Sequence, residues 1–338
     1  MRIRIEQNRQ AGRKFMTDQE VYRLRELLGE ENVREQEPMA LHTSFRVGGP
    51  ADLFVRVDTL ARLQEVLTLL NESGTPWYML GKGTNLLVGD RGYRGCVITM
   101  NGMQEKPVTD TAKEEPGEDV PEDLREIVVE DCVITAGAGA SLAKTAQTAR
   151  RNGLTGLEFA AGIPGSVGGG LVMNAGAYDG SMDLVVEEAV LRMPDGKVMT
   201  VPKRDLRLGY RRSVLKEIPA IALQVKMRLR RGNPDEISAK MQDFAERRRS
   251  KQPLEYPSAG STFKRPEGMF AGKLIMDAGL AGFSIGGAQV SEKHCGFVIN
   301  RDHATAADVR AVIASVQQKV WEKAGVRLEE EVIYLGDF

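Results

Sequence analysis

The sequence is poor in the residues that build disulfide frameworks, metal sites and membrane spans. Among its 338 residues are three cysteines and three histidines, and the cysteines lie far apart without CxxC spacing. This pattern argues against a small disulfide-stabilised domain and against a cysteine zinc site, so we expect no bound metal. No apolar run reaches the roughly 18 residues that a membrane-spanning helix needs, and membrane insertion is not expected.

An excess of charge of either sign is also absent. The 46 Lys and Arg residues nearly balance the 47 Asp and Glu residues, and the net charge is −1. The chain therefore has no general attraction to nucleic acid or to anionic membranes. We expect small-molecule partners, no nucleic acid, and a monomer or a weak homo-oligomer. The N-terminus, MRIRIEQNRQAGRKFM, lacks the apolar segment of a secretory signal. Together with the three widely spaced cysteines, this makes a reducing cytoplasm the expected location.

Helix and strand signals alternate along the chain. Apolar spacing and end signals predict helices over residues 17–29, 59–73, 141–152 and 305–324. Thr17 with Glu20, and Thr305 with Asp308, have the spacing of N-terminal capping pairs. Strand-like segments lie at 42–57, 77–100, 127–140 and 220–231. Many strands with few long helices favour an α+β fold over a doubly wound sheet.

The length of the chain suggests two domains. We expect a disordered extension at residues 1–16, a first domain at 17–231 and a second at 232–338, with the GNPDE segment as the boundary. Residues 105–131 are an insert with eleven acidic and three basic residues, a net charge of −8, and three prolines. This composition is typical of a solvated loop, and an acidic tip that binds a partner is the alternative.

Glycine is concentrated in a few uncharged stretches. Residues 160–180, AAGIPGSVGGGLVMNAGAYDG, hold seven glycines in 21 residues, and GKGTNLL (81–87) and GAGAS (137–141) are similar. Each ordered glycine loses more backbone freedom than any other residue, so something must need bare backbone there. Tight turns explain one such stretch, whereas three together favour a long cofactor with a pyrophosphate and a flat ring. P-loop spacing is absent, and a Rossmann site is poorly supported.

Three further motifs have ordinary explanations when each is taken alone. GYRRS (209–213) is explained by a surface charge pair, YPSAGSTFKRP (256–266) by a turn, and LEEEV (328–332) by solvated acids. No GxSxG elbow is present, and no histidine has triad-like spacing, so Ser261 is not an obvious hydrolase nucleophile.

Taken together, the segments resemble the UDP-N-acetylenolpyruvoylglucosamine reductases, flavoenzymes that make UDP-N-acetylmuramate for bacterial peptidoglycan. The resemblance runs in order through HTSFRVGGPADLFV, LGKGTNLLV, GLEFAAGIPGSVGG, NAGAY, GYRRS, YPSAGSTFKRP, GGAQVSEKHCGFVIN and LEEEV. It covers roughly residues 17–336 outside the acidic insert. Eight ordered motifs make the resemblance specific, whereas any one alone would be weak.

The resemblance implies a fold and two cofactors. We expect an FAD-binding domain of the vanillyl-alcohol-oxidase and p-cresol-methylhydroxylase type, with two subdomains, and a C-terminal α+β domain that binds substrate. NADPH would reduce FAD, and the reduced flavin would deliver hydride to carbon C3 of UDP-N-acetylglucosamine enolpyruvate. The expected FAD contacts are Gly81, Lys82, Gly83, Thr84, Asn85, Leu86, Gly137, Ala138, Gly162, Ile163, Pro164, Gly165, Gly168, Asn174, Ala175 and Gly176.

The resemblance also implies three catalytic residues. They are Arg211 in GYR-x-S, Ser261 in AGS-x-F and Glu331 in LE-x-EV. Arginine binds a carboxylate and stabilises developing negative charge, and a positioned serine donates a proton to a carbanion. Glu331 either holds this geometry or shares the negative charge when protonated, and the sequence leaves both roles open.

The spacing between the arginine and serine motifs resembles the shorter, type II members of the family. Only about 50 positions separate Arg211 from Ser261, too few for the loop with a substrate-contacting tyrosine that the other type carries. Lys251 and Lys264 are then the expected substrate contacts. Two other interpretations remain open: another flavin-linked oxidase or dehydrogenase of this fold that acts on an alcohol or hydroxy acid, and a non-enzymatic nucleotide-binding module.

Overall fold

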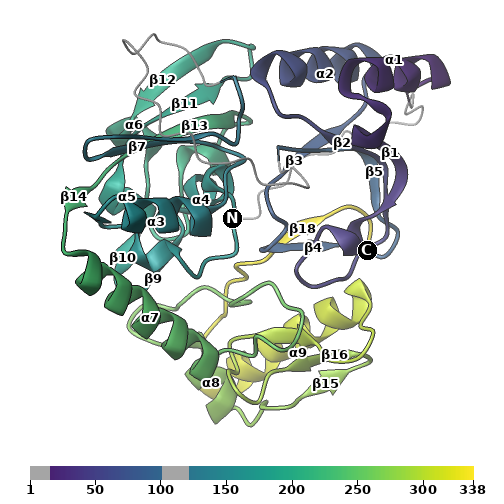
Figure 1. The fold of residues 1–338 in the computed structure, drawn as a ribbon. Coiled ribbons are helices and arrows are strands. Elements are labelled where there is room, and N and C mark those ends of the chain that lie inside the picture. The colour runs from purple at the N-terminus through teal and green to yellow at the C-terminus, as the bar shows by residue number, and fades with distance from the viewer. Residues whose placement is uncertain (1–15, 101–121) are drawn as a thin grey trace.

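The computed structural model describes residues 16–100 and 122–338 of the chain (Figure 1). The predicted extension at 1–16 lies outside the described residues except for Met16, which packs against the hydrophobic core. Most of the predicted acidic insert, up to residue 121, also lies outside them. Figure 1 shows two units with sheets side by side and a smaller C-terminal unit below them.

Helices and strands are mixed throughout the described residues. Their bounds are α1 (Asp18–Leu28), α2 (Leu60–Ser73), α3 (Leu142–Arg151), α4 (Val167–Met173), α5 (Met182–Val185), α6 (Lys203–Leu206), α7 (Pro234–Lys251), α8 (Ala271–Asp277) and α9 (Ala306–Ala324). None of these helices, within the described residues, is long and apolar enough to cross a bilayer.

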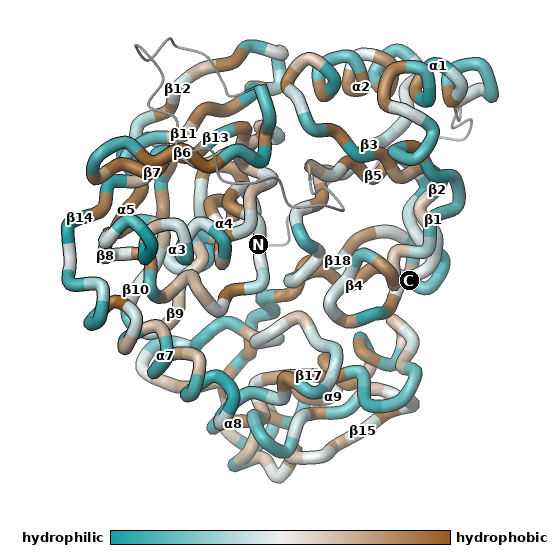
Figure 2. Tube along the Cα trace, in the orientation of Figure 1, coloured by the Kyte–Doolittle hydropathy of each residue, from teal (hydrophilic) through white to brown (hydrophobic). Residues whose placement is uncertain are grey.

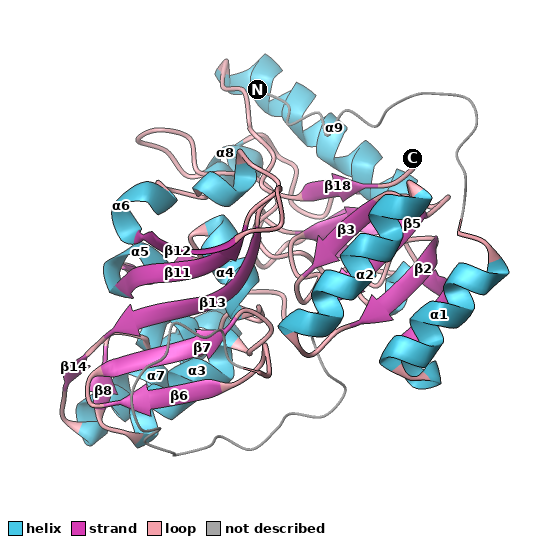
Figure 3. Cartoon of the chain, turned by 90° about the horizontal axis from the view of Figure 1, so that it is seen from above, coloured by secondary structure: helices cyan, strands magenta, loops and turns pink. Residues whose placement is uncertain are grey.

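The first sheet has the strand order β1-β2-β5-β3. Its strands are β1 (Val33–Pro38), β2 (Pro50–Arg56), β5 (Tyr93–Thr99) and β3 (Trp77–Leu80). β1 is antiparallel to β2, whereas β2 and β3 both pair parallel with β5, which requires a crossover that α2 supplies. The apolar stripes of α1 and α2 are buried, and Figure 3 shows both helices over this sheet.

The second sheet is antiparallel and has the order β12-β11-β13-β7-β6. Its strands are β12 (Val198–Pro202), β11 (Val186–Arg192), β13 (Ile221–Arg228), β7 (Val133–Gly137) and β6 (Ile127–Glu130). α3 and α4 pack against β7, and α4 also packs against β13. Figure 2 shows apolar residues concentrated on the central strands of both sheets, and one hydrophobic cluster includes residues of both.

The C-terminal unit has its own core. The strands β15 (Ser284–Ile285), β16 (Ala288–Val290) and β17 (Val298–Asn300) form a small antiparallel sheet against which α9 packs. The chain then returns to the first unit, where β18 (Ile333–Leu335) pairs parallel with β4 (Leu86–Val88). This return brings the LEEEV motif beside the GKGTN loop.

Short strand pairs complete the second unit. They are β8 (Leu154–Thr155) with β14 (Arg230–Arg231), and β9 (Gly176–Ala177) with β10 (Gly180–Ser181). α7 packs on this unit, because Ile237 and Met241 belong to its hydrophobic cluster. The predicted domain boundary at residue 232 stays a prediction, and side-chain packing places α7 with the larger part of the molecule.

The local helix predictions are confirmed. α1 and α9 begin with complete capping boxes, Thr17 with Glu20 and Thr305 with Asp308. α2 and α3 lie within their predicted ranges, although the side chain of Ser141, the N-cap of α3, makes no capping hydrogen bond. These end signals work because each bond joins residues three positions apart.

The predicted loop at 105–131 is wrong at its C-terminal end. Residues 127–130 form β6, which pairs with β7 over four residue pairs. Leu124 is fully buried, and Nε of Arg125 donates to Asp123 Oδ1 at 2.9 Å in the turn before the strand. The acidic insert and the strand predicted at 127–140 overlap over residues 127–131, and the structure confirms the strand from residue 127.

Candidate active site

The GYRRS motif forms a tight turn that presents Arg211. Gly209 and Arg212 exchange two backbone hydrogen bonds of 3.0 Å across the turn. Arg211 has φ +53°, in the left-handed region that residues with side chains rarely adopt. Nζ of Lys216, at the end of the 3₁₀ turn η4 (Val214–Lys216), donates to the Arg211 carbonyl at 3.2 Å. Such a conformation persists where surrounding contacts hold it, as they do here.

Arg211 pairs with Glu331. Its Nε donates to Glu331 Oε1 at 2.5 Å, and the two side chains are only 20% and 11% exposed. Salt therefore screens this pair much less than an exposed one. Asn85 of the GKGTN loop supports the same residue, because its Nδ2 donates to the Glu331 carbonyl at 2.9 Å. The pair thus depends on three segments that are far apart in the sequence.

The serine loop lies directly beside Glu331. The backbone N–H of Glu331 donates to the carbonyl of Thr262 at 2.9 Å, and Thr262 is fully buried. Gly260 has φ +73°, and a Cβ added there would meet no atom of the described residues within 4 Å. Ser261, between these two residues, is half-buried, and its hydroxyl bonds no other residue in the described ranges. The structure therefore brings together the segments that carry the three predicted catalytic residues.

Five charged residues lie at the site: Arg211, Lys216, Lys264, Glu329 and Glu331. Lys264 pairs with Glu329, and Lys216 contacts Arg211. Burial raises the pKa of Glu331, and the nearby Arg211 only partly offsets this effect. Burial also lowers the pKa of Lys216, and the positive charge of Lys264 acts in the same direction. The excess of positive charge favours an anionic ligand.

The predicted lysines have different positions, and one lysine was missed. Lys264 lies at the site, whereas Lys251 is the exposed last residue of α7 and has no hydrogen bond or ion pair to the site within the described residues. Lys216 was not predicted, since only the fold of η4 returns its Nζ to the arginine turn. A basic residue shortly after GYRRS was the only sequence signal for it.

Most of the predicted cofactor glycines face other parts of the protein. A Cβ added at Gly83 would lie 1.9 Å from the His42 carbonyl oxygen, and one at Gly137 would lie 2.2 Å from the Leu124 carbonyl oxygen. The nearest protein atom would be within 3.3 Å at four others: Gly162, Gly165, Gly168 and Gly176. Packing against backbone therefore explains the missing side chains at Gly83 and Gly137, whereas the nearest atoms at Gly162 and Gly165 belong to the flexible side chains of Arg248 and Leu142.

Two glycine loops still leave bare backbone for a ligand. A Cβ added at Gly81 would meet Ser166 Oγ at 3.0 Å and then only Gly169, at 3.9 Å. Among the described residues, Gly81 and Gly169 therefore lie close together with little side-chain cover. A pyrophosphate requires such close access to backbone N–H groups, so the residues present fit FAD.

The remaining predicted FAD contacts fall into two groups. The side chains that reach the surface at least in part are Lys82, Thr84, Ile163 and Pro164. The other five already make contacts within the protein. Leu86 is buried in β4, and the N–H groups of Ala138 and Ala175 bond backbone carbonyls. The side-chain amides of Asn85 and Asn174 also bond backbone carbonyls. All sixteen FAD contacts stay predictions.

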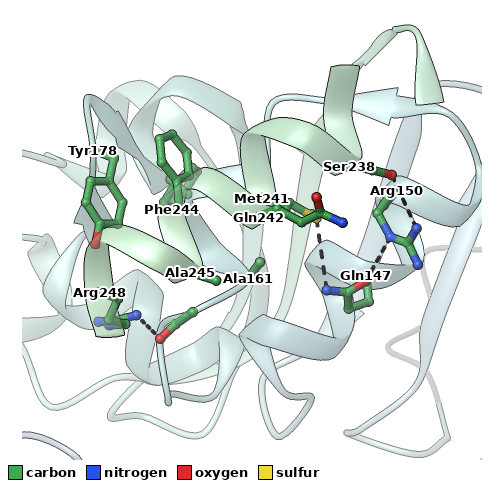
Figure 4. Close-up of a pocket in the computed structure, with 12 residues that line it drawn as sticks. Gln147, Arg150, Ala161, Tyr178, Ser238, Met241, Gln242, Phe244, Ala245 and Arg248 are labelled. Atoms are coloured by element: carbon green, nitrogen blue, oxygen red, sulfur yellow. Dashed lines mark hydrogen bonds between the residues drawn. The ribbon is translucent and has the colours of Figure 1, made fainter. Parts of the chain in front are cut away.

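A pocket of about 360 Å³ lies between α3, α7 and the 3₁₀ turn η3 (Glu158–Ala160). In Figure 4 the rings of Tyr178 and Phe244 lie against one another, and Arg248 reaches the carbonyl of Gly162. Arg150 on the other side bonds Gln147 and a serine of α7. The pocket is lined by Gly162 but by none of the three catalytic candidates.

Comparison with known proteins decides among the interpretations that the sequence left open. A family model described as UDP-N-acetylenolpyruvoylglucosamine reductase, C-terminal domain, matches residues 252–335, and one described as FAD binding domain matches residues 51–202. A UDP-N-acetylenolpyruvoylglucosamine reductase of Agathobacter rectalis is 49% identical over 306 residues, which cover 90% of this chain and 94% of that protein. The chain belongs to the UDP-N-acetylenolpyruvoylglucosamine reductase family.

Other members of this reductase family match this chain over nearly its full length. The reductase of Clostridium botulinum is 45% identical over 317 residues, 94% of this chain and 97% of that protein. The solved structure of the reductase from Thermus caldophilus superimposes with a TM-score of 0.69 at 32% identity and covers 88% of this chain and 97% of that one. The predicted family, the FAD-binding fold with a separate C-terminal domain, and FAD as cofactor are confirmed.

In this reductase, Gly83→Ala is expected to destabilise the fold more than Gly74→Ala. Both glycines have left-handed φ values, +63° and +69°, but an added Cβ meets a carbonyl oxygen at 1.9 Å only at Gly83 and nothing within 4 Å at Gly74. We expect a loss of about 1–2 kcal/mol for Gly74→Ala from backbone strain alone. Overpacking adds about 1–3 kcal/mol for Gly83→Ala. Urea unfolding measures both, and equal losses would contradict the packing role of Gly83.

The raised pKa of Glu331 predicts how stability changes with pH. A carboxyl whose folded pKa lies above its ordinary value of 4.5 binds more protons in the folded state than in the unfolded state. The free energy of unfolding of the wild type, relative to Glu331→Gln, should therefore fall as pH rises from 4.5 through the raised pKa, by at most about 1.4 kcal/mol per pH unit. Urea unfolding at several pH values measures this difference. A difference that rises with pH would mean that Arg211, not burial, dominates the pKa.

Proposed function

We propose that the chain is an FAD-dependent oxidoreductase that reduces the enolpyruvyl group of UDP-N-acetylglucosamine enolpyruvate to give UDP-N-acetylmuramate, with NADPH as the electron source. Family membership and the FAD-binding domain support the class of reaction. The observation that carries the assignment is the pairing of Arg211 with Glu331 directly beside the serine loop.

The reaction needs a hydride, a proton and a group that stabilises negative charge. FAD, when bound, supplies the hydride that it takes from NADPH. Hydride addition at C3 of the enol ether leaves negative charge at C2, next to the substrate carboxylate. Ser261 donates its hydroxyl proton to C2, which completes the addition of one hydride and one proton across the double bond. The hydroxyl of Ser261 makes no hydrogen bond to another residue of the described ranges, which supports this role.

Arg211 binds the substrate carboxylate through its terminal amino groups, because Glu331 already takes its Nε. Glu331 thereby fixes the plane of the guanidinium. Lys216, whose Nζ donates to the Arg211 carbonyl, adds a second positive charge near the arginine and helps to stabilise the charge at C2. Lys264 lies close enough to the same cluster to serve the sugar-nucleotide diphosphate, and Lys251 stays a second proposed contact for it.

Anaerobic stopped-flow absorbance of the purified yellow protein tests this function. NADPH should bleach the flavin absorbance, and UDP-N-acetylglucosamine enolpyruvate should restore it while UDP-N-acetylmuramate forms. Flavin reduction by an alcohol or hydroxy acid, followed by rapid reoxidation by oxygen, would instead favour a flavin-linked oxidase of the same fold. A colourless protein that rebinds no FAD would favour the non-enzymatic module.

The proposed reaction places the protein in peptidoglycan precursor synthesis, and through it in the maintenance of cell shape and in cell division. Nucleotide substrates and scarce cysteines support a cytoplasmic location. We retain a monomer or weak homo-oligomer as the proposed state, with small-molecule substrates as the partners.

A further inference from the structure

Asn174 ends α4 in a conformation that its side chain helps to fix. It has φ +41°, is 5% exposed, and forms the left-handed cap of the helix. Its Nδ2 donates to the Gly209 carbonyl at 2.9 Å, and its Oδ1 accepts the backbone N–H of Asp183 at 2.9 Å. Both ends of the amide are therefore bound to protein backbone.

Gly209, which accepts one of these bonds, is the first residue of the Arg211 turn. The other end of the turn is tied to α4 as well, because the buried Ser213 donates through Oγ to the Val172 carbonyl at 2.7 Å. Two side-chain bonds thus hold the turn against the last turn of α4. A left-handed Arg211 needs such support, since its conformation is otherwise disfavoured.

The opposite end of α4 lies at the predicted flavin loops. Its N-cap Ser166 accepts the N–H of Gly169 at 3.2 Å, and the same hydroxyl oxygen lies where a Cβ of Gly81 would be 3.0 Å away. α4 has seven residues, so it is a short rigid connection between loop 81–87 and the arginine turn.

We propose that Asn174 is a positioning residue for Arg211, which sets the place of the arginine turn relative to α4 and the flavin loops and acts on the reaction only through that arginine. The inference rests on the proposed function. It also gives Asn174 a role different from the FAD contact that its motif predicts, because both ends of its amide already bond protein backbone.

Asn174→Asp tests the bond to Gly209. Aspartate keeps an oxygen for the Asp183 N–H but turns a second oxygen toward the Gly209 carbonyl, which repels it. FAD affinity and flavin reduction by NADPH should equal those of the wild type, while oxidation by UDP-N-acetylglucosamine enolpyruvate should slow about 100-fold, as misplaced catalytic groups do. Asn174→Gly, which tolerates the left-handed backbone and removes both amide bonds, should show the same pattern if the aspartate variant folds poorly.

A double-mutant cycle separates positioning from a general loss of stability. When Arg211→Lys is already present, Asn174→Asp should lower the oxidative rate by less than about 3-fold, since the arginine that it positions is gone. Asn152→Asp is the matched control: Asn152 caps α3 and donates to the Thr148 carbonyl at 3.0 Å, away from the turn, and its variant should keep the wild-type oxidative rate.

Three outcomes would overturn the inference. Asn174→Asp could lose FAD while the oxidative rate stays normal, which would restore the cofactor role. It could slow oxidation equally with and without Arg211, which would show an independent effect. It could match the wild type in both half-reactions. A wild type that NADPH reduces but the enolpyruvyl substrate does not reoxidise would instead contradict the proposed function.

Discussion

Ser261→Ala is expected to keep flavin reduction by NADPH and to slow the oxidative half-reaction by about 10²- to 10⁴-fold, the usual contribution of a positioned general acid. The hydroxyl is the proton source in the proposed reaction, and alanine removes it without adding bulk. The backbone bonds of Thr262 that hold the loop against Glu331 and Gly296 remain in the variant. Stopped-flow absorbance measures the two half-reactions separately.

Ser258→Ala is the matched control for this loop. Ser258 is half-buried, lies three residues before Ser261, and meets Ile299 through its backbone. Its variant should change neither half-reaction by more than about 3-fold, because the Ser258 side chain makes no hydrogen bond to the site within the described residues. A Ser261→Ala enzyme that oxidises at the parent rate would remove the serine from the role of proton donor.

Features set by neighbouring residues could be predicted from the sequence. The capping boxes at Thr17 and Thr305 and the apolar stripe of α2 involve positions three or four residues apart, and the structure has them where they were expected. Such signals survive because the first turn of a helix satisfies its own N–H groups locally. The acidic segment 105–131 shows the limit, since its composition predicts a loop that overlaps the strand expected, and found, from residue 127.

Features set by distant residues could not be predicted from spacing. The parallel pairing of β4 with β18 joins residues 86–88 to residues 333–335, and it brings Asn85 to the carbonyl of Glu331. Lys216 reaches Arg211 only because η4 folds back. The same limit applies to Gly83, whose missing side chain is explained by the carbonyl oxygen of His42, about forty residues earlier.

The motifs identified the catalytic candidates but not what holds them. Arg211, Ser261 and Glu331 were assigned from three short patterns, and the structure brings their segments together through backbone and side-chain bonds. The asparagines in the glycine-rich motifs were assigned to the cofactor, yet their amides bond the carbonyls of Glu331 and Gly209. A motif combines residues that contact ligands with residues that support them, and only the hydrogen bonds distinguish the two.

Arg211→Lys is expected to lower the rate of the oxidative half-reaction by about 10²- to 10³-fold, the cost of removing one donor to a developing anion. Arginine can bind Glu331 through Nε and the substrate carboxylate through its terminal amino groups at the same time. Lysine has a single charged nitrogen and a different reach, so it cannot bridge two carboxylates in this planar way. Flavin reduction by NADPH should stay near the wild-type rate, because this step does not use the substrate carboxylate.

Arg212→Lys is the control that isolates the role of the guanidinium from its place in the turn. Arg212 is the next residue, its side chain is 64% exposed, and it pairs with Glu217 on the surface. Exposed pairs of this kind contribute about 0–1 kcal/mol, so this variant should keep both half-reactions within a few-fold of the wild type. Equal losses in the two variants would mean that any change in the turn disturbs the site. A loss confined to Arg211→Lys would tie the oxidative step to the arginine that Glu331 holds.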